Sequence, residues 1–331
     1  MNDERRSAER WGRALWIEAP ERAAIRSTRL PALGEGDVEV EATFSGLSRG
    51  TESLVFRGQV PAELHASMRC PHQEGDHSFP VKYGYCSVGR VVAGAEGVGS
   101  RVFCLHPHQD RYVVSARDVV PIPDGVPDTR AVLAANMETA VNGVWDAAPA
   151  IGSRVAVIGA GAVGLLAASL LARLPGIELQ VVEIAPEKDA TIRALGLTPV
   201  RPEQAARDCD LVLHASGAPA GLELALQLAG FEASIVELSW YGTKSVPLSL
   251  GGRFHNARLR IQSSQVGHVA TGQRARWSYR RRMDLALRLL ADDAYDVLLG
   301  EPVRFAEVPD ALPRMLGGGG SAAATALIAY R

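Results

Sequence analysis

A glycine-rich turn between two apolar stretches is the most informative feature of the sequence. Residues 155–164 read VAVIGAGAVG, and the apolar segment LLAASLLARL follows directly. The first stretch is typical of a buried parallel strand and the second of a helix, so the glycines lie at a strand-to-helix turn. At such a turn Gly159 permits the tight bend, Gly161 lets a pyrophosphate approach, and Gly164 lets the helix pack on the strand. The spacing predicts a dinucleotide site, which also includes Ala162 and Val163.

An acidic residue stands where such a site needs one. Glu183 lies in the next apolar stretch, LQVVEI, nineteen residues after Gly164. A carboxylate at this place accepts hydrogen bonds from both hydroxyls of the adenosine ribose. The same charge repels a 2′-phosphate, so we expect NAD rather than NADP, with Lys188 beside the adenosine.

Later strand ends extend the predicted site. The segments DLVLHAS and ASIVELS are separated by the helical segment GLELALQLA, which predicts a parallel sheet with helices on both faces. Ligands bind such sheets at the carboxyl ends of the strands. His214 is assigned to the core or the sheet edge and receives no role. The expected cofactor contacts are Ser216, Gly217 and Leu238, together with Ser263 and Gln265, which could fix a carboxamide.

Composition bounds the class of protein. The 331 residues are enough for about two domains, and 47% hydrophobic content lets each bury a core. The 35 basic residues nearly balance the 37 acidic ones, which gives no reason to expect nucleic acid as a partner. No stretch approaches the ~18 apolar residues that a membrane span requires, so we expect a cytoplasmic protein. The four cysteines are scattered, which fits reduced thiols.

The region before residue 147 differs from the part that carries the glycine turn. It is rich in valine, glycine and proline with short alternating runs such as DVEVEATFSGLSRG, which predicts a mainly antiparallel β domain. The last residues, ATALIAYR, predict one more strand, preceded by the helix RRMDLALRLLADD and a GGGGS turn. We expect an α/β protein in which 1–146 and 268–331 form the β-rich domain and 147–267 the inserted nucleotide-binding domain.

The order of these elements resembles the medium-chain dehydrogenase/reductase superfamily, which includes zinc-type alcohol dehydrogenases and quinone reductases. The resemblance covers nearly the whole chain. It rests on SGLSRGTE followed by RGQVP, on YGYCSVGRVVAGAEGVGSRVF, on METAVNGVWDA, and on VAVIGAGAVG with Glu183. Within the superfamily, SRGTE followed by YGY resembles the bacteriochlorophyllide dehydrogenase-like branch. The resemblance implies a GroES-like catalytic domain, a doubly wound Rossmann domain, a cleft between them and a homodimer.

The zinc ligands of that superfamily have no counterparts in this chain. The cysteine position falls on Ser48 or Arg49, the histidine position on Tyr85, and the third ligand position near Ala135 or Asn136. A cluster of cysteines for a structural zinc is also absent from the sequence. We therefore expect neither a catalytic nor a structural zinc.

Two other groups of cysteine and histidine come close together in the sequence. Cys70, His72 and His77 could gather around a metal, but MRCPHQEGDHSFP is typical of a polar surface loop. In CLHPHQ, Pro107 breaks the alternation that would place Cys104, His106 and His108 on one face of a strand. Neither group changes the expectation that the protein holds no metal.

Without a metal, a side chain must exchange a proton with the substrate oxygen while hydride moves. Tyr85 is the first candidate, because a phenol can donate or accept and a nearby cation such as Arg49 would lower its pKa. Packing against the core is the alternative for Tyr85, and Arg49 and Glu52 could equally form a structural ion pair. The resemblance places Glu138 and Asn136 at the cleft as substrate anchors or relay groups. It also makes Thr139 a cofactor contact and puts Ser48 in the substrate pocket.

Further candidates lie near the end of the nucleotide-binding domain. In SWYGTK, Trp240 and Tyr241 are flat side chains suited either to a ring-bearing substrate or to a domain interface. His255 could shuttle a proton or be structural. An arginine cluster at 274, 276, 280, 281 and 282 could clamp an anionic group or form a solvated helix face.

Taken together, the sequence predicts a zinc-independent, NAD-linked oxidoreductase that interconverts an alcohol and a carbonyl of a small-molecule substrate. Reduction of an activated double bond, as in quinone reductase relatives, is the alternative within the same class. A protein that binds NAD without turnover is the alternative of a different class. A methyltransferase also pairs a glycine turn with an acid, but the preceding β domain and the returning C-terminus argue against it.

Overall fold

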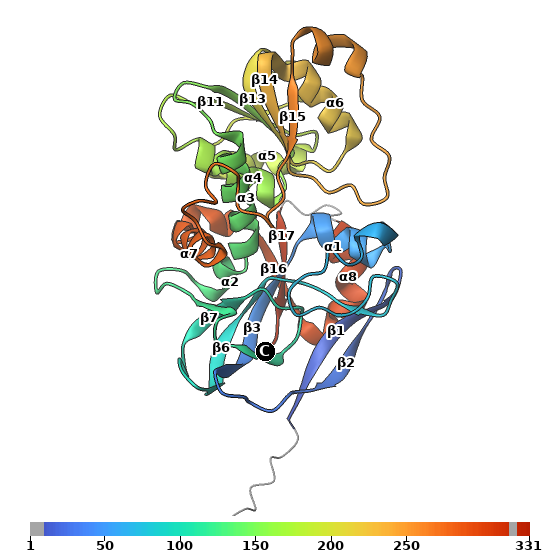
Figure 1. Cartoon of the computed structure of the whole chain (residues 1–331), viewed down its shortest axis with the longest axis vertical. Coiled ribbons are helices and arrows are strands. Elements are labelled where there is room, and N and C mark those ends of the chain that lie inside the picture. Colours follow the sequence, from blue (N-terminus) through green and yellow to red (C-terminus); the bar gives the residue numbers. More distant parts are fainter. Residues whose placement is uncertain (1–9, 318–322) are drawn as a thin grey trace, which may run out of the picture.

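The computed structural model of the chain describes residues 10–317 and 323–331, which form three sheets (Figure 1). The predicted GGGGS turn lies almost entirely outside these residues. A nucleotide-binding-type sheet occupies the upper part of the view in Figure 1, and the β-rich part lies below it. Within the described residues, no helix is long and apolar enough to cross a membrane.

The upper sheet is parallel throughout and has the strand order β12-β11-β10-β13-β14-β15. This is the order of a doubly wound dinucleotide-binding fold, in which the direction of winding reverses between the first and fourth strands, here β10 and β13. The strands are β10 (Arg154–Ile158), β11 (Glu178–Val182), β12 (Pro199–Val200), β13 (Cys209–His214), β14 (Ala229–Glu237) and β15 (Arg260–Ser263).

Helices cover both faces of this sheet, which explains why its central strands are apolar on both sides. Val155 and Val157 face a core shared with α3 and α4, whereas Ala156 and Ile158 face a core shared with α6. The helices around this sheet are α3 (Ala134–Ala147), α4 (Ala162–Leu171), α5 (Asp189–Ala194) and α6 (Pro219–Leu228), with short helical turns at Pro186–Lys188, Pro202–Gln204 and Leu250–Phe254.

The β-rich part contains the other two sheets. One has the order β2-β1-β5-β4; the other has the order β16-β17-β3-β6-β7-β9, with β8 also pairing with β3. Their strands are β1 (Trp11–Ala19), β2 (Arg22–Arg29), β3 (Asp37–Leu47), β4 (Glu74–Gly75), β5 (Val81–Lys82), β6 (Ser87–Gly94), β7 (Arg101–Cys104), β8 (Arg111–Ser115) and β9 (Val119–Pro121). Helices α1 (Arg49–Phe56) and α2 (Asp128–Ala131) and the turn Ala62–Leu64 lie along this stretch.

The C-terminal part returns to the β-rich part, as predicted. Strand β17 (Thr325–Ala329) pairs antiparallel with β3 and parallel with β16 (Leu299–Arg304). Helix α7 (Tyr279–Leu289) packs on α3, and α8 (Val308–Gly317) lies near α1. Short turns at Asp293–Leu298 and Phe305–Glu307 complete this part. The predicted α/β class, with a β-rich domain and a doubly wound parallel sheet, is confirmed. The predicted division at residue 147 falls at the last residue of α3, and that at 267 falls just after β15.

Candidate functional site

The glycine turn between β10 and α4 leaves space where a dinucleotide needs it. Gly159 has a φ of 103° and lies so close to β13 that a Cβ there would be 2.7 Å from the Cα of Ser216. A Cβ on Gly164 would be 2.0 Å from the carbonyl oxygen of Gly159, so the helix packs tightly on the turn. By contrast, a Cβ on Gly161 would have no heavy atom of the described chain within 4 Å. The turn therefore has no room for side chains at Gly159 and Gly164, whereas the described residues leave free space beside Gly161.

The first turn of α4 can receive an anion at this opening. Gly161 is its N-cap and provides no side-chain acceptor for the amides of Ala162 and Val163. Free amides at a helix start favour phosphate oxygens. The residues present therefore fit the pyrophosphate of a dinucleotide.

Glu183 follows β11 and reaches back to the glycine turn. One carboxylate oxygen accepts from the amide of Ala160 and from the Lys188 ammonium, both at 2.9 Å. The other accepts from the amides of Ile184 and Ala185, at 2.8 and 3.0 Å. Burial raises the pKa of Glu183, but the bonds from Lys188 and the backbone outweigh burial and hold the pKa below its usual value. The carboxylate is thus ionised at neutral pH, and Lys188 is its partner.

The predicted cofactor contacts at the other strand ends lie at the carboxyl edge of the sheet. Ser216 and Gly217 follow β13, and Ser216 is exposed. Leu238 follows β14 and approaches α3, since a Cβ on Gly143 would be 2.6 Å from its side chain. Thr139 on α3 donates to the carbonyl of Ala135 at 2.9 Å.

The segment after β15 is held by a residue that the sequence reasoning missed. Ser263 and Gln265 are exposed, whereas Ser264 between them is buried and donates to Asp146 at 2.6 Å. The neighbouring Asn142 accepts from the amide of Ala270 at 3.0 Å. These bonds tie the segment to α3.

Tyr85 packs against two apolar clusters: one that extends from the β-rich part through α3 into the doubly wound sheet, and one that lies within the β-rich part. Burial raises the pKa of its phenol well above the usual value, and Glu52 adds to this, while hydrogen bonds with Ser48 and Thr51 act in the opposite direction. The expectation that Arg49 lowers this pKa is wrong. The Arg49 guanidinium instead donates to the carbonyls of Met315, at 3.0 Å, and Ala323.

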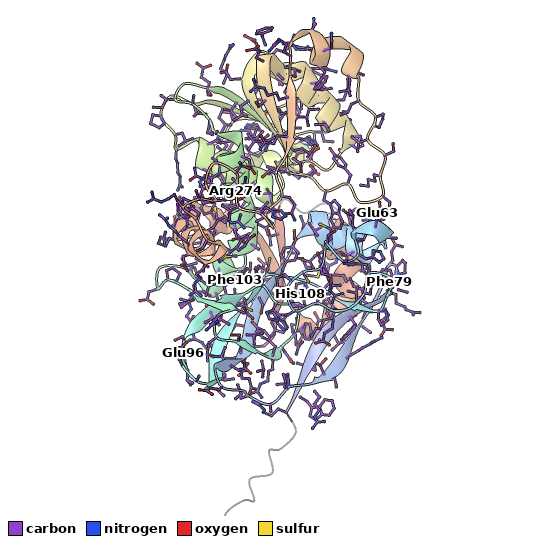
Figure 2. The ribbon with its side chains drawn as sticks, viewed as in Figure 1. Glu63, Phe79, Glu96, Phe103, His108 and Arg274 are labelled. Atoms are coloured by element: carbon purple, nitrogen blue, oxygen red, sulfur yellow. The ribbon has the colours of Figure 1, made fainter. Side chains whose placement is uncertain are left out.

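Glu52 pairs with a histidine rather than with Arg49. Its Oε2 lies 2.8 Å from Nε2 of the buried His108, and its Oε1 accepts from the amide of Ser48 at 2.8 Å. The Nδ1 of His108 lies 2.8 Å from the hydroxyl of Ser45, so both ring nitrogens are bound. A Cβ on Gly84 would be 2.8 Å from this imidazole. His108, labelled in Figure 2, therefore packs against Gly84 in the segment between β5 and β6, which also carries Tyr85.

Glu138 is bound to the arginine cluster. Its Oε1 accepts from the Nε of Arg282 at 3.0 Å, and Arg282 also donates to Asn142 at 2.6 Å and to the carbonyl of Val266 at 2.6 Å. Burial raises the pKa of Glu138, and Arg282 partly offsets this. Because Arg282 is buried and fully engaged, it is not available to clamp a substrate anion, and the interpretation of all five arginines as one clamp or one solvated face is wrong.

The other predicted residues are distributed as follows. Asn136 is buried on α3. His255 is exposed and directly follows the helical turn Leu250–Phe254, which packs on α6. This turn belongs to a different apolar cluster from the two that Tyr85 contacts. Trp240 packs against the same apolar cluster of the β-rich domain as Tyr85. The hydroxyl of Tyr241 donates to Glu237 at 2.9 Å. Among the described residues, no group of three or more histidine, cysteine or acidic side chains is arranged to hold a metal ion.

The chain is similar in sequence to 2-desacetyl-2-hydroxyethyl bacteriochlorophyllide A dehydrogenase from two bacteria. The protein of Rhodobacter capsulatus is 29% identical over 251 residues, which cover 69% of this chain and 73% of the relative. The protein of Cereibacter sphaeroides is 31% identical over 88 residues, which cover 27% of this chain and 24% of the relative, so that match spans about a quarter of the relative's length. No family model matches the chain.

Solved structures share the fold over nearly the whole chain. L-idonate 5-dehydrogenase of Escherichia coli has a TM-score of 0.79 at 14% identity, covering 98% of this chain and 99% of that one. A short chain alcohol dehydrogenase of Escherichia coli complexed with NADH has a TM-score of 0.77 at 19% identity, with 97% and 99% covered. A protein of Sinorhizobium meliloti described as a zinc-binding dehydrogenase, bound to NADP, has a TM-score of 0.75 at 17% identity, with 97% and 100% covered.

Proposed function

We propose that this chain, whose fold is that of the medium-chain dehydrogenases and reductases, is an oxidoreductase that uses NAD(H) to interconvert an alcohol and a carbonyl. The sequence relatives are named as dehydrogenases, and two structural neighbours hold NADH or NADP. The observation that carries the proposal is the glycine turn, which is closed at Gly164 and open at Gly161, at the point where the winding of the sheet reverses.

The chain's own residues explain how a nicotinamide nucleotide would be held. The amides at the start of α4 would bind the pyrophosphate, and the edges of β13 and β14 would border the rest. The ionised carboxylate of Glu183 favours ribose hydroxyls and disfavours a 2′-phosphate, which supports NAD over NADP. A bound nicotinamide supplies or accepts the hydride.

The side chains at the family's zinc positions do not fit zinc. Catalytic zinc in proteins is held by thiolates, imidazoles and carboxylates. None of these groups is offered at the three positions, which fall on Ser48 or Arg49, on Tyr85, and on Ala135 or Asn136. We therefore assign no step to zinc. The carbonyl oxygen is instead met by hydrogen-bond donors of the chain.

Tyr85 is the side chain best placed to exchange a proton with that oxygen. Its raised pKa keeps the phenol protonated at neutral pH, so it donates a hydrogen bond as negative charge develops on the oxygen during carbonyl reduction. The hydroxyls of Ser48 and Thr51 bond to the phenol and orient it. Because a protonated phenol cannot accept a proton, alcohol oxidation would start from the phenolate that carbonyl reduction leaves.

We expect the substrate to carry a ring. Trp240 and Tyr85 pack against the same apolar cluster, so a flat aromatic side chain accompanies the proton donor. The sequence relatives are named for a hydroxyethyl-bearing bacteriochlorophyllide. Exposed arginines of the cluster could also meet an anionic group; these are Arg274, Arg276, Arg280 and Arg281.

We also propose that two copies of the chain associate through β15. All four residues of this strand are exposed, and β15 ends the sheet on that side. An edge strand with free backbone groups can pair with its copy in a continuous sheet.

The test is a nucleotide-binding and turnover assay on the purified protein with its metal content measured by mass spectrometry. We expect NADH to bind more tightly than NADPH and to be oxidised in the presence of ring-bearing ketones, with less than one zinc in ten chains. Oxidation with enones or quinones but not with ketones would instead establish the double-bond reductase. Tight binding of NADH without hydride transfer to any substrate would refute the enzyme and leave a nucleotide-binding protein.

A further inference from the structure

A chain of hydrogen-bonded polar side chains at the ends of β13 and β14, buried at His214 and Glu237, has no part in the proposed reaction. His214, with no exposed surface, places its Nδ1 2.8 Å from Oε2 of Glu237 and its Nε2 2.6 Å from the hydroxyl of Ser216. The hydroxyl of Tyr241 donates to the same Glu237 oxygen at 2.9 Å. Buried polar groups are costly unless they are satisfied, so the chain of bonds must be kept intact in the folded protein.

The order serine, histidine, glutamate is also that of a hydrolase triad, but the surroundings do not support a nucleophile. An acyl-transfer site needs free amides to stabilise an oxyanion. The amide of Gly217 already donates to the hydroxyl of Ser239 at 3.0 Å, and that of Ala218 donates to Ser216 at 3.2 Å. The group therefore holds the backbone rather than attacking a substrate.

Glu237 holds the start of the segment 239–249, which leaves the sheet after β14. Its Oε1 accepts from the amide of Ser239 at 2.7 Å, and its Oε2 holds the hydroxyl of Tyr241. These two contacts flank Trp240 on both sides. Three bonds to one carboxylate, counting that of His214, thus fix the backbone that presents the tryptophan.

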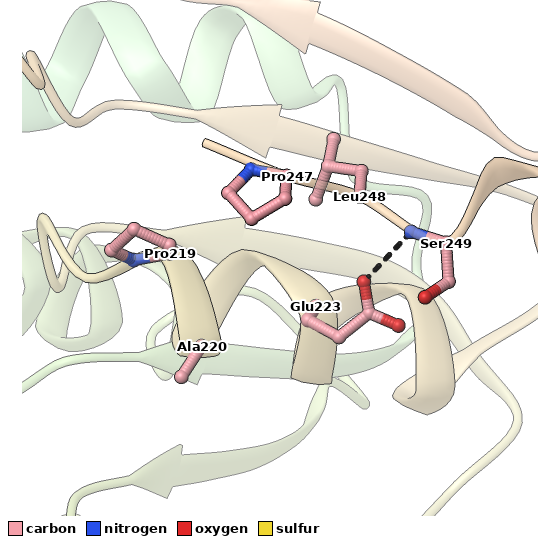
Figure 3. A pocket seen from close by; sticks show the side chains of 6 residues that line it. All are labelled: Pro219, Ala220, Glu223, Pro247, Leu248 and Ser249. Carbon is pink, nitrogen blue, oxygen red and sulfur yellow. Dashed lines mark hydrogen bonds between the residues drawn. The ribbon is translucent and has the colours of Figure 1, made fainter. Parts of the chain in front are cut away.

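The rest of the segment is anchored to other elements. The amide of Thr243 donates to the carbonyl of Gln59 in the β-rich domain at 3.1 Å. Gly242 lies so close that a Cβ there would be 2.3 Å from the same carbonyl oxygen. Further along, Glu223 on α6 accepts from the amide of Ser249 at 3.0 Å (Figure 3). Residues 239–249, which we call the strap, therefore connect the doubly wound domain with the β-rich domain. Trp240 lies in the part of the strap between these two domains.

The other end of the polar chain lies against the dinucleotide turn. Ser216 packs on Gly159, where a Cβ would be 2.7 Å from the serine Cα. The side chains from Ser216 through His214 and Glu237 to Tyr241 therefore connect the glycine turn with the strap.

We propose that Glu237, oriented by His214, is a positioning residue that fixes Trp240 as one wall of the substrate pocket, and that this wall selects substrates with a flat ring. The role in selectivity rests on the proposed oxidoreductase function. The position of Trp240 does not, and it can be measured without any turnover.

The first experiment measures the accessibility of Trp240 by acrylamide quenching in the full-length protein, with Trp240→Phe used to subtract the other four tryptophans. Glu237→Gln and Tyr241→Phe should each raise the quenching constant of Trp240 by about twofold or more, because a charged anchor or its partner is lost. Glu232→Gln on the same strand, which removes a surface pair with Arg258, should not. Tyr279→Phe removes one surface tyrosine hydrogen bond, to Gly267, and is the matched tyrosine control.

The second experiment compares acetophenone with acetone as substrates of the same variants. Glu237→Gln should raise KM for acetophenone about tenfold, with kcat/KM for acetone and the Kd for NADH both within about twofold of the starting protein. If Glu237→Gln does not fold, Tyr241→Phe, which deletes one hydroxyl, decides in its place. Unchanged quenching of Trp240 overturns the proposal. Altered quenching with no turnover by the unmodified protein supports the positioning and refutes only the proposed enzyme.

Discussion

Replacing Gly161 by valine should weaken dinucleotide binding at least about 30-fold while leaving the fold intact. The structure separates these two effects, because the added Cβ would meet no heavy atom of the described chain within 4 Å but would project into the opening at the start of α4. The backbone of Gly161, at φ −85° and ψ 177°, is extended, and valine adopts it readily.

The expected magnitudes follow from these contacts. Valine is a poorer N-cap than glycine by at most about 1 kcal/mol, and the lower entropy of its unfolded chain returns about half of that. The free energy of unfolding should therefore change by less than about 1 kcal/mol. Loss of the phosphate contacts at a helix start costs up to about 2 kcal/mol, which corresponds to roughly a 30-fold weaker Kd for NADH, before any steric clash is added.

Two variants complete the design. Gly125→Val is the control, because Gly125 also has no neighbour within 4 Å among the described residues and lies outside the site; it should leave both quantities unchanged. Gly164→Ala should instead act mainly on stability. Its Cβ would be 2.0 Å from a carbonyl oxygen and would lower the free energy of unfolding by about 1–3 kcal/mol. The measurements are urea unfolding and calorimetric titration with NADH. Full-strength binding by a folded Gly161→Val protein would refute the dinucleotide site.

Three further predictions follow from the buried charges and hydroxyls. Glu183→Gln should raise the ratio of kcat/KM for NADPH to that for NADH at least about tenfold. Because the folded pKa of Glu183 is lowered, the stability that its carboxylate supplies is complete above about pH 4.3 and is lost as the pH falls through the folded pKa. The unmodified protein should therefore have the higher free energy of unfolding at neutral pH, and its difference from Glu183→Gln should shrink towards zero in acid. Tyr85→Phe should lower kcat at least about tenfold with an unchanged Kd for NADH, and unchanged kinetics would remove the phenol from the reaction. Arg282→Met should lower the free energy of unfolding by about 3–5 kcal/mol because it leaves Glu138 buried and unpaired, and adding Glu138→Leu should recover most of the loss; a double variant as unstable as the single would contradict this.

The parts of the fold that depend on residues close together in the sequence could be predicted from the sequence. The turn at Gly159 to Gly164, the strands around it and the position of Glu183 follow from apolar runs and fixed spacings. The fold expected from those motifs is confirmed, since solved dehydrogenases share it over nearly the whole chain at 14% and 19% identity.

The partners of the buried charges could not be predicted in this way. Arg282 and Glu138 are 144 positions apart, and His108 and Glu52 are 56 apart, so only the packed structure brings them together. Arg49 was expected near Tyr85 because both were aligned with zinc-ligand positions of the superfamily, yet its long side chain reaches carbonyls of the C-terminal part instead. His214 did leave a usable signal. It and Glu237 are the last residues of adjacent parallel strands and lie in register, so two polar residues ending two apolar runs indicate a pair on one face.

The two buried histidine–glutamate pairs have the same construction on different domains. Glu52 binds His108 with one oxygen and the amide of Ser48 with the other, while Glu237 binds His214 with one oxygen and the amide of Ser239 with the other.

In the first pair the amide belongs to Ser48, which is itself a candidate pocket residue, and in the second it belongs to Ser239, which directly precedes Trp240. Tyr85 and Trp240 in turn pack against one apolar cluster. A carboxylate that is held by a buried imidazole has little freedom to turn. Each pair therefore fixes the position of the loop whose backbone amide donates to it. Tyr85 and Trp240, which come from different domains, are thus each tied to a carboxylate anchored within its own domain.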